Sequence, residues 1–460
     1  MATQIRDPIH NFISLNDEEI KIIDTRSFQR LRGIHQLACA YLVYPGAVHT
    51  RFEHSLGVAH VAGNMAKILE IDDDRVRIVR LAALLHDLGH GPFSHISEPL
   101  LERYADKKKL PADQKTSKIH ELITAEIIKS DKQITKIIGS DAAERITQLL
   151  EKGFSKPALK SIVSGPIDAD KQDYLLRDSF FCGVKYGIFD IHQLHRSITL
   201  VGNDYDEQLM VKSDGVFAVE QYILAKYYLT ANVLLHRVRL ITDEMIKRAI
   251  ILGIEKDEIK DLHKIYSYDG TNKFIENYKK WNDSSFLNKF CLDCRKKTLC
   301  KELLEGLVNR NLLKRIFKLH TKNFESNVSD AILSLFEPSR REDKANIEKM
   351  ISQELAKCTK SEVNPDFVIL NLNKIGNVRK LPEEDESEIL VDDSPRPPKP
   401  FREISTLFKS ISLYTDEFIE VYAPLNRDPI EERKKICDAL KNPIKELIEK
   451  YTPKTGGDES

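Results

Sequence analysis

The stretch LAALLHDLGHGPFSH, residues 81–95, decides how this sequence is expected to fold. It closes a longer apolar pattern, RVRIVRLAALLH, whose spacing is typical of a buried helix. The helix is predicted to end at the adjacent pair His86 and Asp87, because the glycines and the proline of GHGP interrupt helices. A buried helix end would deliver an imidazole and a carboxylate to one place.

Two other segments offer side chains of the same kinds. HTRFEHSLGVAH places His54 just before a predicted helix start at Ser55, and PIDADKQDYLLRD offers Asp170 among several carboxylates. Two imidazoles and two carboxylates suit a borderline divalent cation such as manganese, iron or zinc better than calcium, which prefers oxygen ligands alone. Spacing by itself does not select these four residues.

The order of five motifs along the chain provides the basis for choosing these four residues. Along the chain they are IRDPIHNFISL, FQRLRGIHQL, YPGAVHTRFEHSLGVAH, HDLGHGPFSH and PIDADKQDYLLRD. This ordered set resembles the HD phosphohydrolase superfamily and, within it, the deoxynucleoside triphosphate triphosphohydrolases (dNTPases), over roughly residues 5 to 200. The resemblance implies a divalent metal ion, either manganese, iron, zinc or magnesium. It implies four metal ligands: His54, His86, Asp87 and Asp170.

The resemblance also implies proton-transfer groups beside the α-phosphorus of a triphosphate. His90, His95 and His120 occupy the matching positions, although SKIHELIT around His120 is less distinctive. Imidazole exchanges a proton near pH 7, which a departing 5′-oxygen requires. Glu98, one turn beyond His95, is expected to orient or assist one of these histidines. The alternative for each of the four is an ordinary surface or supporting residue.

A triphosphate carries about four negative charges, so fixed cations must offset them. The resemblance nominates Arg51 and Lys171, each of which could instead be a surface ion-pair partner. Vertebrate relatives grip the terminal phosphate with an arginine and touch the base with a tyrosine, and Asn232 and Leu240 stand at the matching places here. Both of those functions therefore stay open.

The predicted helix DADKQDYLLRD carries a row of functional positions. Asp170, Tyr174 and Asp178 are spaced i, i+4 and i+8 and share one face. At ~1.5 Å per residue this row spans about 12 Å, comparable to the distance from an α-phosphate metal to the far side of a sugar. The resemblance gives Asp178 and Gln36 the deoxyribose 3′-hydroxyl and packs Tyr174 where a 2′-hydroxyl would clash.

Regulation by nucleotide is a further implication of the resemblance. Asp24, Gln29 and Arg32, within DTRSFQRLR, match positions at which relatives bind an activating nucleotide between subunits. The alternative is a structural helix start capped by Asp24 or Thr25.

Helical spacing of apolar residues dominates from residue 17 to about residue 355. We therefore predict a mainly α fold, in which residues 1–355 form the HD-domain helical phosphohydrolase core. Residues 356–460 are predicted to form a smaller α+β region, because FVILNLNKI, EILV and EFIEVYAP read as strands.

Several local elements are also predicted. Short hairpins are expected near IHNFISL and near ITLVGNDYDEQLMV, where Gly202, Asn203 and Asp204 supply a turn. DDSPRPPKP should be a surface loop, because its prolines lack backbone donors. PIEERKKICDALKNPIKELIEKY reads as one or two amphipathic helices interrupted at Pro443.

Composition narrows the partners and the compartment. The chain has 70 basic and 71 acidic residues, so no chain-wide field would attract nucleic acid, which is a possible but not a favoured partner, and any anion site must be local. No signal peptide and no apolar run of roughly 20 residues is evident, so a cytoplasmic protein without membrane contact is expected. Among seven cysteines, Cys291, Cys294 and Cys300 cluster; we assign them to packing, since the second pair of a zinc knuckle is missing.

The favoured hypothesis is metal-dependent hydrolysis of deoxynucleoside triphosphates to deoxynucleoside and tripolyphosphate, by water attack at the α-phosphorus. It pictures a homo-oligomer, a dimer or tetramer, that nucleotide activates at a subunit interface. The alternatives are an HD-type phosphodiesterase or nuclease on single-stranded or cyclic nucleotides, and a non-catalytic nucleotide sensor. The intact H…HD…D set argues against the sensor, and released tripolyphosphate would separate the two enzymes.

Overall fold

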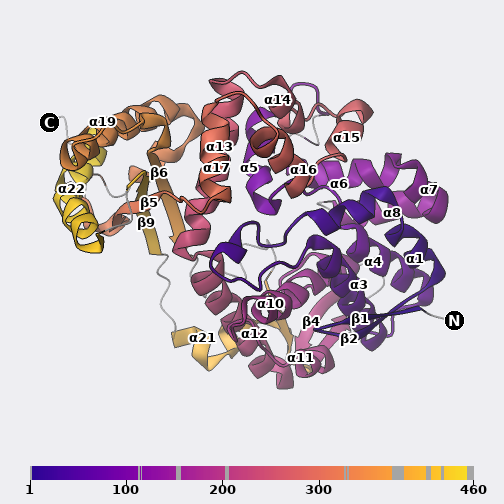
Figure 1. The fold of residues 1–460 in the computed structure, drawn as a ribbon. Helices are drawn as coiled ribbons and strands as arrows, with labels where there is room; N and C mark the ends of the chain where they lie inside the picture. Colours follow the sequence, from indigo (N-terminus) through magenta and orange to yellow (C-terminus); the bar gives the residue numbers. More distant parts are fainter. Residues whose placement is uncertain are drawn as a thin grey trace. The chain divides into compact units, whose positions relative to one another are not determined.

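The structure is a computed structural model that describes most of the 460 residues (Figure 1). Outside its described part lie residues 1–2, 112–113, 115–116, 152–156, 203–206, 326–327, 329–330, 376–387, 411–415, 426–428 and 453–460. The described chain is mainly helical with a few small sheets, which confirms the predicted fold class.

The chain groups into two compact units whose segments alternate along the sequence. The first unit comprises Met1–Arg239, Ile259–Lys289 and Asn377–Leu413, and the second comprises Leu240–Glu258, Phe290–Gly376 and Tyr414–Ser460. The division predicted between residues 355 and 356 stays a prediction.

The first unit begins with a hairpin of β1 (Thr3–Asp7) and β2 (Asn11–Leu15), as predicted near IHNFISL. Ile13 and Leu15 are buried while their neighbours along β2 are exposed, so one face of the hairpin packs inward. Asn16 then starts α1 (Asp17–Ile23) with a capping box.

Three helices form the centre of the first unit: α3 (Arg51–Ile68), α4 (Asp73–Leu85) and α10 (Ala169–Cys182). α3 packs against both of the others, and small residues such as Ala59 and Ala62 are fully buried along it. Asp72 caps α4 and Asp168 caps α10 through their side chains. The other α-helices of this unit are α2 (Arg26–Gln29), α5 (Ser97–Tyr104), α6 (Ile119–Ser130), α7 (Lys132–Ile138), α8 (Ser140–Leu150), α9 (Pro157–Val163), α11 (Ile191–Ser197), α12 (Val216–Leu229), α14 (Lys260–Tyr266), α15 (Asn272–Tyr278), α16 (Asp283–Leu287), α20 (Phe401–Ile404) and α21 (Thr406–Ser410).

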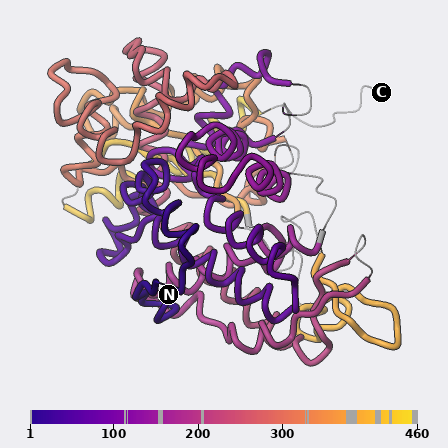
Figure 2. Tube along the Cα trace, turned by 90° about the vertical axis from the view of Figure 1, so that its right-hand side faces the viewer, coloured from indigo at the N-terminus to yellow at the C-terminus, as the bar shows by residue number. Residues whose placement is uncertain are grey.

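A four-stranded sheet completes the first unit. β3 (Ile198–Val201) and β4 (Gln208–Lys212) form the predicted antiparallel hairpin. Gly202 follows β3, whereas Asn203 and Asp204 lie outside the described residues. β7 (Leu390–Asp392) pairs parallel with β4, and β8 (Lys399–Pro400) pairs antiparallel with β7. Figure 2 shows the orange segment of β7 and β8 returning to the magenta segment of β3 and β4.

Two sequence predictions for the C-terminal part need adjustment. The strand predicted at EILV exists as β7, but it belongs to the first unit. The predicted loop DDSPRPPKP is exposed at residues 394–398, while its last two residues pair as β8.

The second unit is built around a three-stranded antiparallel sheet in the order β5–β9–β6. β6 (Ile369–Ile375) and β9 (Asp416–Ala423) are the predicted strands, whereas β5 (Lys314–His320) falls in the stretch predicted to be helical. The helices are α13 (Arg237–Glu255, mostly in this unit), α17 (Leu299–Val308), α19 (Arg341–Thr359) and α22 (Ile430–Tyr451). α22 is a single helix despite Pro443, and it buries Leu440 and Ile444 in the core of the unit.

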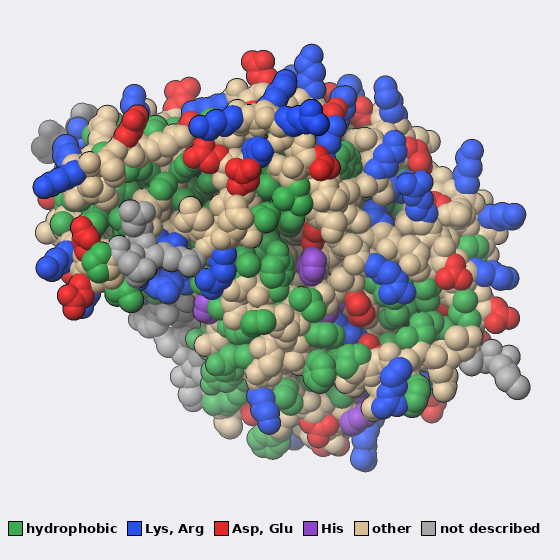
Figure 3. All heavy atoms as spheres, in the orientation of Figure 1, with side chains coloured by type: hydrophobic (Ala, Val, Ile, Leu, Met, Phe, Trp, Pro, Cys, Tyr) green, Lys and Arg blue, Asp and Glu red, His purple; other side chains and the backbone are tan. Residues whose placement is uncertain are grey.

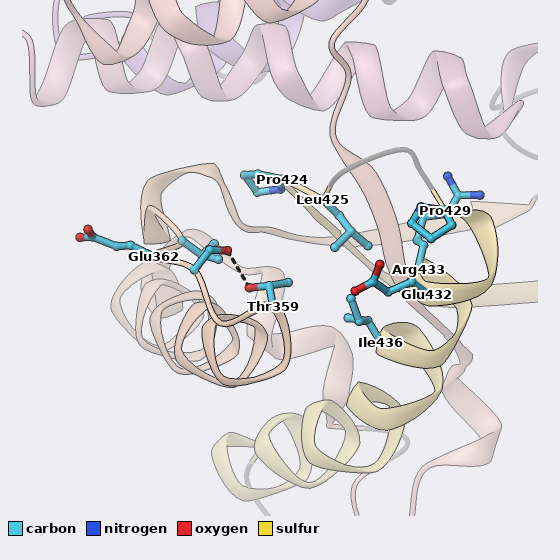
Figure 4. A pocket seen from close by; sticks show the side chains of 10 residues that line it. Thr359, Glu362, Pro424, Leu425, Pro429, Glu432, Arg433 and Ile436 are labelled. Carbon is cyan, nitrogen blue, oxygen red and sulfur yellow. Dashed lines mark hydrogen bonds between the residues drawn. The ribbon is translucent and has the colours of Figure 1, made fainter.

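A cavity of about 370 Å³ lies in the second unit between the end of α19 and the start of α22 (Figure 4). Its lining includes Thr359, Leu425, Glu432 and Ile436. None of the predicted site residues lines it, so this cavity does not mark the predicted reaction site.

The molecular surface carries both signs of charge. Basic and acidic side chains are interspersed over the face in Figure 3, as the net charge of −1 predicts. No helix within the described ranges is both long and apolar enough to cross a bilayer. Cys291 and Cys300 are buried free thiols, and Cys294 is partly exposed.

Candidate metal centre and active site

α3 delivers His54 to the candidate site. The helix begins at Arg51 rather than at the predicted Ser55, because Thr50 and Glu53 form a capping box. The Glu53 carboxylate accepts a hydrogen bond from the Thr50 amide at 3.0 Å. His54 consequently lies in the first turn of the helix, and it is fully buried.

α4 delivers His86 and Asp87 at its C-terminal end, where His86 is the C-cap residue. The His86 Nδ1–H donates to the Ala83 carbonyl oxygen at 2.7 Å. Nε2 of His86 is therefore left with a lone pair; it is buried and has no hydrogen-bond partner within the described chain. The Asp87 Oδ1 atom lies 3.1 Å from it without hydrogen-bond alignment.

The turn after Asp87 is held from two sides. Arg30 donates from Nη2 to the Leu88 carbonyl at 2.5 Å and to the His90 carbonyl at 2.9 Å. On the other side α6 approaches closely: a Cβ at Gly89 would lie 2.1 Å from the His120 carbonyl oxygen. Only glycine permits this approach, which brings His120 and His90 together.

The four predicted metal ligands converge. His54 Nε2 lies 2.9 Å from Asp170 Oδ1 and 3.9 Å from Asp87 Oδ2. His86 Nε2 lies 3.8 Å from Asp170 Oδ1. Ligand atoms of His54, His86 and Asp170 all lie within 4.8 Å of one another, which suits one small cation.

The protonation pattern of these groups fits a metal ion. Nδ1 of His54 contacts Asp173 Oδ2 at 2.8 Å, so Nε2 is the nitrogen that faces the carboxylates of Asp87 and Asp170. Burial opposes a charge on His54, but its hydrogen bonds with Asp170 and Asp173 outweigh burial and raise its pKa to about 10. The carboxylates around His54 thus stabilise a positive charge. A divalent cation bound by these carboxylates and by neutral imidazoles would provide that charge.

A second cluster adjoins the first and contains the four predicted catalytic residues. The rings of His90 and His120 stack at 4.8 Å, and those of His90 and His95 meet edge to face at 5.3 Å. The Glu98 carboxylate accepts a hydrogen bond from His95 Nδ1 at 2.6 Å, and its Oε1 lies 3.6 Å from His90 Nδ1. His90 Nε2 lies 3.3 Å from Asp87 Oδ1, which links the two clusters.

Burial and charge divide the roles within this cluster. Burial lowers the pKa of His90 to about 3, so the ring is neutral at pH 7. Burial alone would raise the pKa of Glu98, but the hydrogen bond from His95 and the neighbouring imidazoles lower it, so Glu98 is ionised. Glu98 can therefore stabilise an imidazolium at His95, whose side chain is 57% exposed and open to a substrate.

The two predicted phosphate-binding cations both have carboxylate partners. Arg51 is buried, donates from Nη1 to Asp87 Oδ2 at 2.6 Å, and places Nη2 3.3 Å from His95 Nε2. Arg51 therefore joins the two clusters. Lys171 donates from Nζ to Asp168 Oδ2 at 2.7 Å and to a backbone carbonyl of the same loop.

The predicted sugar-binding residues meet a histidine that the sequence analysis did not select. Asp178 Oδ1 accepts a hydrogen bond from His49 Nε2 at 2.8 Å, and the backbone N–H of Gln36 donates to the His49 carbonyl oxygen at 3.0 Å. Gln36 Oε1 and His49 Nδ1 are buried acceptors without partners within the described chain. They suit a ligand hydroxyl as donor. Tyr174 lies on the same helix as Asp178, half-buried.

Asp24, Gln29 and Arg32 lie close together in sequence around α2. Gln29 accepts from Arg32 Nε at 2.9 Å, and the Arg32 guanidinium lies over the Phe52 ring at 3.4 Å. Asp24 is exposed at the end of α1, whereas Thr25 is the cap of α2. The segment therefore contains a capped helix start, which was the structural alternative. Nucleotide binding by Asp24, Gln29 and Arg32 stays a prediction.

Several supporting residues were not selected from the sequence: Arg30, His49, Asp173, His10 and Arg177. Asp173 and Arg177 follow Asp170 at i+3 and i+7 on α10, so helical spacing could have indicated them. His10 is 163 residues from its partner Asp173, and no local pattern indicates that pairing.

Two family models match the chain. The HD domain model matches residues 51–175, a range that includes the four predicted metal ligands, and the HD associated region model matches residues 189–439.

Known proteins resemble this chain in sequence and in fold. An uncharacterized protein of Methanocaldococcus jannaschii is 38% identical over 260 residues, 56% of this chain and 52% of that protein. The human deoxynucleoside triphosphate triphosphohydrolase SAMHD1 is 31% identical over 341 residues, 68% of this chain and 54% of that protein. The matches thus span about half the length of these relatives. A phosphohydrolase from Bacteroides thetaiotaomicron shares the fold, with a TM-score of 0.69 at 23% identity over 92% of this chain and 100% of that chain.

Proposed function

The chain belongs to the HD-domain phosphohydrolase superfamily, and from this premise we propose that it hydrolyses deoxynucleoside triphosphates to deoxynucleoside and tripolyphosphate. The observation that carries the proposal is the convergence of His54, His86, Asp87 and Asp170 beside a cluster of proton-transfer groups. The similarity to the human dNTPase supports the choice of substrate.

A divalent cation held by His54, His86, Asp87 and Asp170 would supply Lewis acidity toward an α-phosphate oxygen and lower the pKa of a water molecule. The other steps fall to side chains. Arg51, freed in part from Asp87 by that ion, would turn hydrogen bonds toward the phosphates.

His95 is the candidate general acid in this proposal. Glu98 keeps a proton on His95 Nδ1 and stabilises the imidazolium, so that Nε2 can donate to the departing 5′-oxygen. His90, neutral at pH 7, would accept a hydrogen bond from a water molecule beside the phosphate, and His120 packs on its ring. His90, His95, Glu98 and His120 would thus carry out or support the proton transfers of the reaction.

The sugar subsite would lie along α10. Asp178 and Gln36 would bind the 3′-hydroxyl, which can donate one hydrogen bond and accept another, and Tyr174 would fill the volume that a 2′-hydroxyl needs. Lys171 would have to exchange its contact with Asp168 for a phosphate. Activation by nucleotide at Asp24, Gln29 and Arg32, and assembly into a dimer or tetramer, remain parts of this proposal.

An HD-type phosphodiesterase or nuclease is the second candidate. Asn232 stands where a terminal-phosphate arginine would be expected, and its side-chain amide donates to the Tyr228 carbonyl of its own helical segment. A substrate without a terminal phosphate would not need that arginine.

Product analysis tests the proposal. The purified protein would be incubated with each deoxynucleoside triphosphate singly and in mixtures, with manganese or magnesium, beside a His86→Ala/Asp87→Ala variant. Tripolyphosphate and deoxynucleoside released only by the intact site support the proposal, and activity confined to mixtures supports nucleotide activation. No turnover in any mixture by metal-loaded protein would refute it, and oligonucleotides would be tested next.

Glu98→Gln is expected to lower kcat about 100-fold, because the imidazolium of His95 would lose its carboxylate partner. The manganese content should equal that of the wild type, since Glu98 is outside the proposed ligand set. Glu102→Gln on the same helix is the matched control: its carboxylate contacts Lys107 and the Ile119 amide, so kcat should be unchanged. Equal kcat for the two variants would remove Glu98 from the mechanism.

A further inference from the structure

Asp173 is a buried carboxylate that the proposed ligand set does not include. Within the part of the chain that the structure describes, four side-chain hydrogen bonds converge on it. Oδ1 accepts from His10 Nε2 at 2.7 Å and from Arg177 Nη2 at 2.9 Å. Oδ2 accepts from His54 Nδ1 and from Arg177 Nε, both at 2.8 Å. Each oxygen therefore has two donors, and the orientation of the carboxylate is fixed.

The hydrogen bonds of Asp173 determine which nitrogen of His54 carries a proton. The Arg177 guanidinium, which stays charged in proteins, donates to both oxygens of Asp173, so this carboxylate is ionised. An ionised carboxylate only accepts hydrogen bonds, so the proton of a neutral His54 must sit on Nδ1. Nε2, 2.9 Å from Asp170, is then the nitrogen with a free lone pair.

The N-terminal hairpin supplies one side of this arrangement. In the turn between β1 and β2, Asp7 Oδ1 accepts from the amides of Ile9 and His10, both at 2.9 Å. Asp7 Oδ2 accepts from Arg177 Nη1 at 2.9 Å. Asp7 therefore holds the backbone of His10 with one carboxylate oxygen and Arg177 with the other, and these are two of the three residues that donate to Asp173.

We propose that Asp173 is a positioning residue for His54, and that His10 and Asp7 of the N-terminal hairpin thereby tune the metal affinity of a site they do not touch. The proposal rests on the proposed metal centre. An outer carboxylate that fixes the tautomer and ring orientation of a ligating histidine contributes to metal affinity, and its loss commonly weakens binding about 10- to 100-fold.

A purely structural role explains the arrangement less well. A buried charge network is no more stabilising than well-packed apolar side chains of the same volume, because its desolvation cost is large. The chain nevertheless buries two carboxylates and a guanidinium here, with Asp173 and Arg177 completely inaccessible. Among the described residues, the hydrogen bond that leads from this network to a proposed ligand is that of Asp173 with His54.

Metal affinity tests the proposal without any substrate. Mn²⁺ would be titrated into apo-protein and followed by electron paramagnetic resonance, and the visible spectrum of the Co²⁺-loaded protein would report the ligand geometry. The variants are Asp173→Asn and the milder His10→Gln. The matched control is His195→Gln, which removes another buried imidazole, one whose ring is hydrogen-bonded to Gln172 at 2.8 Å within the described chain.

We expect the Mn²⁺ dissociation constant to rise 10- to 100-fold in Asp173→Asn and several-fold in His10→Gln, with an altered Co²⁺ spectrum in both. His195→Gln should bind metal as the wild type does. If Asp173→Asn does not fold, His10→Gln decides alone. Wild-type affinity in folded His10→Gln and Asp173→Asn would overturn the inference and leave the proposed function standing. A wild-type protein that binds neither metal would overturn both.

Discussion

Replacing Arg177 with methionine is expected to lower the urea midpoint of the first unit by on the order of 2 M. The guanidinium is fully buried and donates to both Asp173 and Asp7, so its loss leaves two carboxylates buried without their cation. Breaking a buried pair in this way costs about 3–5 kcal/mol, which corresponds to such a shift at a typical urea dependence of about 2 kcal/mol per molar. Trp281, the single tryptophan of the chain, belongs to the first unit, so its fluorescence follows this transition.

An exposed arginine provides the comparison for Arg177→Met. Arg145 pairs with Asp74, and the two side chains are 37% and 60% exposed. Solvent screens such a pair, so Arg145→Met should unfold at the same urea concentration as the wild type. If both variants had the same midpoint, the buried network would contribute nothing to stability.

The convergence of the proposed metal ligands was partly predictable from the sequence, since the resemblance selected them and local patterns placed them. His86 and Asp87 are adjacent in the chain, and the residues that end their helix, such as Gly89, are adjacent too, so a short motif contains two proposed ligands and the helix end that presents them. Asp170 and Asp178 share a helix face, and that spacing survives in α10. Local patterns of this kind are reliable because the helix itself fixes the relative positions.

Long-range pairings could not be predicted in the same way. Asp7 and Arg177 are separated by 170 residues, and only the packing of the hairpin on α10 brings them together. EILV was correctly predicted as a strand, but which sheet it joins depends on β4, far earlier in the chain. β5 was missed because a bulge between Arg315 and Phe317 breaks the alternation that indicates a strand.

Gly57→Ala is expected to weaken metal binding at least 10-fold although it improves helix propensity. A Cβ at Gly57 would lie 1.9 Å from Asp173 Oδ1 and 2.5 Å from Arg177 Nη2. Neither group can retreat, because both are completely buried and hydrogen-bonded. Asp173 must therefore shift, and His54 on the same turn of α3 shifts with it. Mn²⁺ titration measures the effect on affinity, and Trp281 fluorescence measures stability.

Gly63→Ala on the same helix separates this clash from a general effect of alanine in α3. A Cβ there would lie 2.4 Å from Arg80 Nη1, and Arg80 is held by the buried Glu19 at 2.7 Å. Overpacking such a site costs about 1–3 kcal/mol, so Gly63→Ala and Gly57→Ala should both lose stability. Among the described residues Arg80 is hydrogen-bonded to Glu19 and not to Asp173, so Mn²⁺ affinity should stay at the wild-type value in Gly63→Ala alone. Equal Mn²⁺ affinity in the two variants would mean that the position of Asp173 does not control the site. Gly57 would then serve only the close packing of α3.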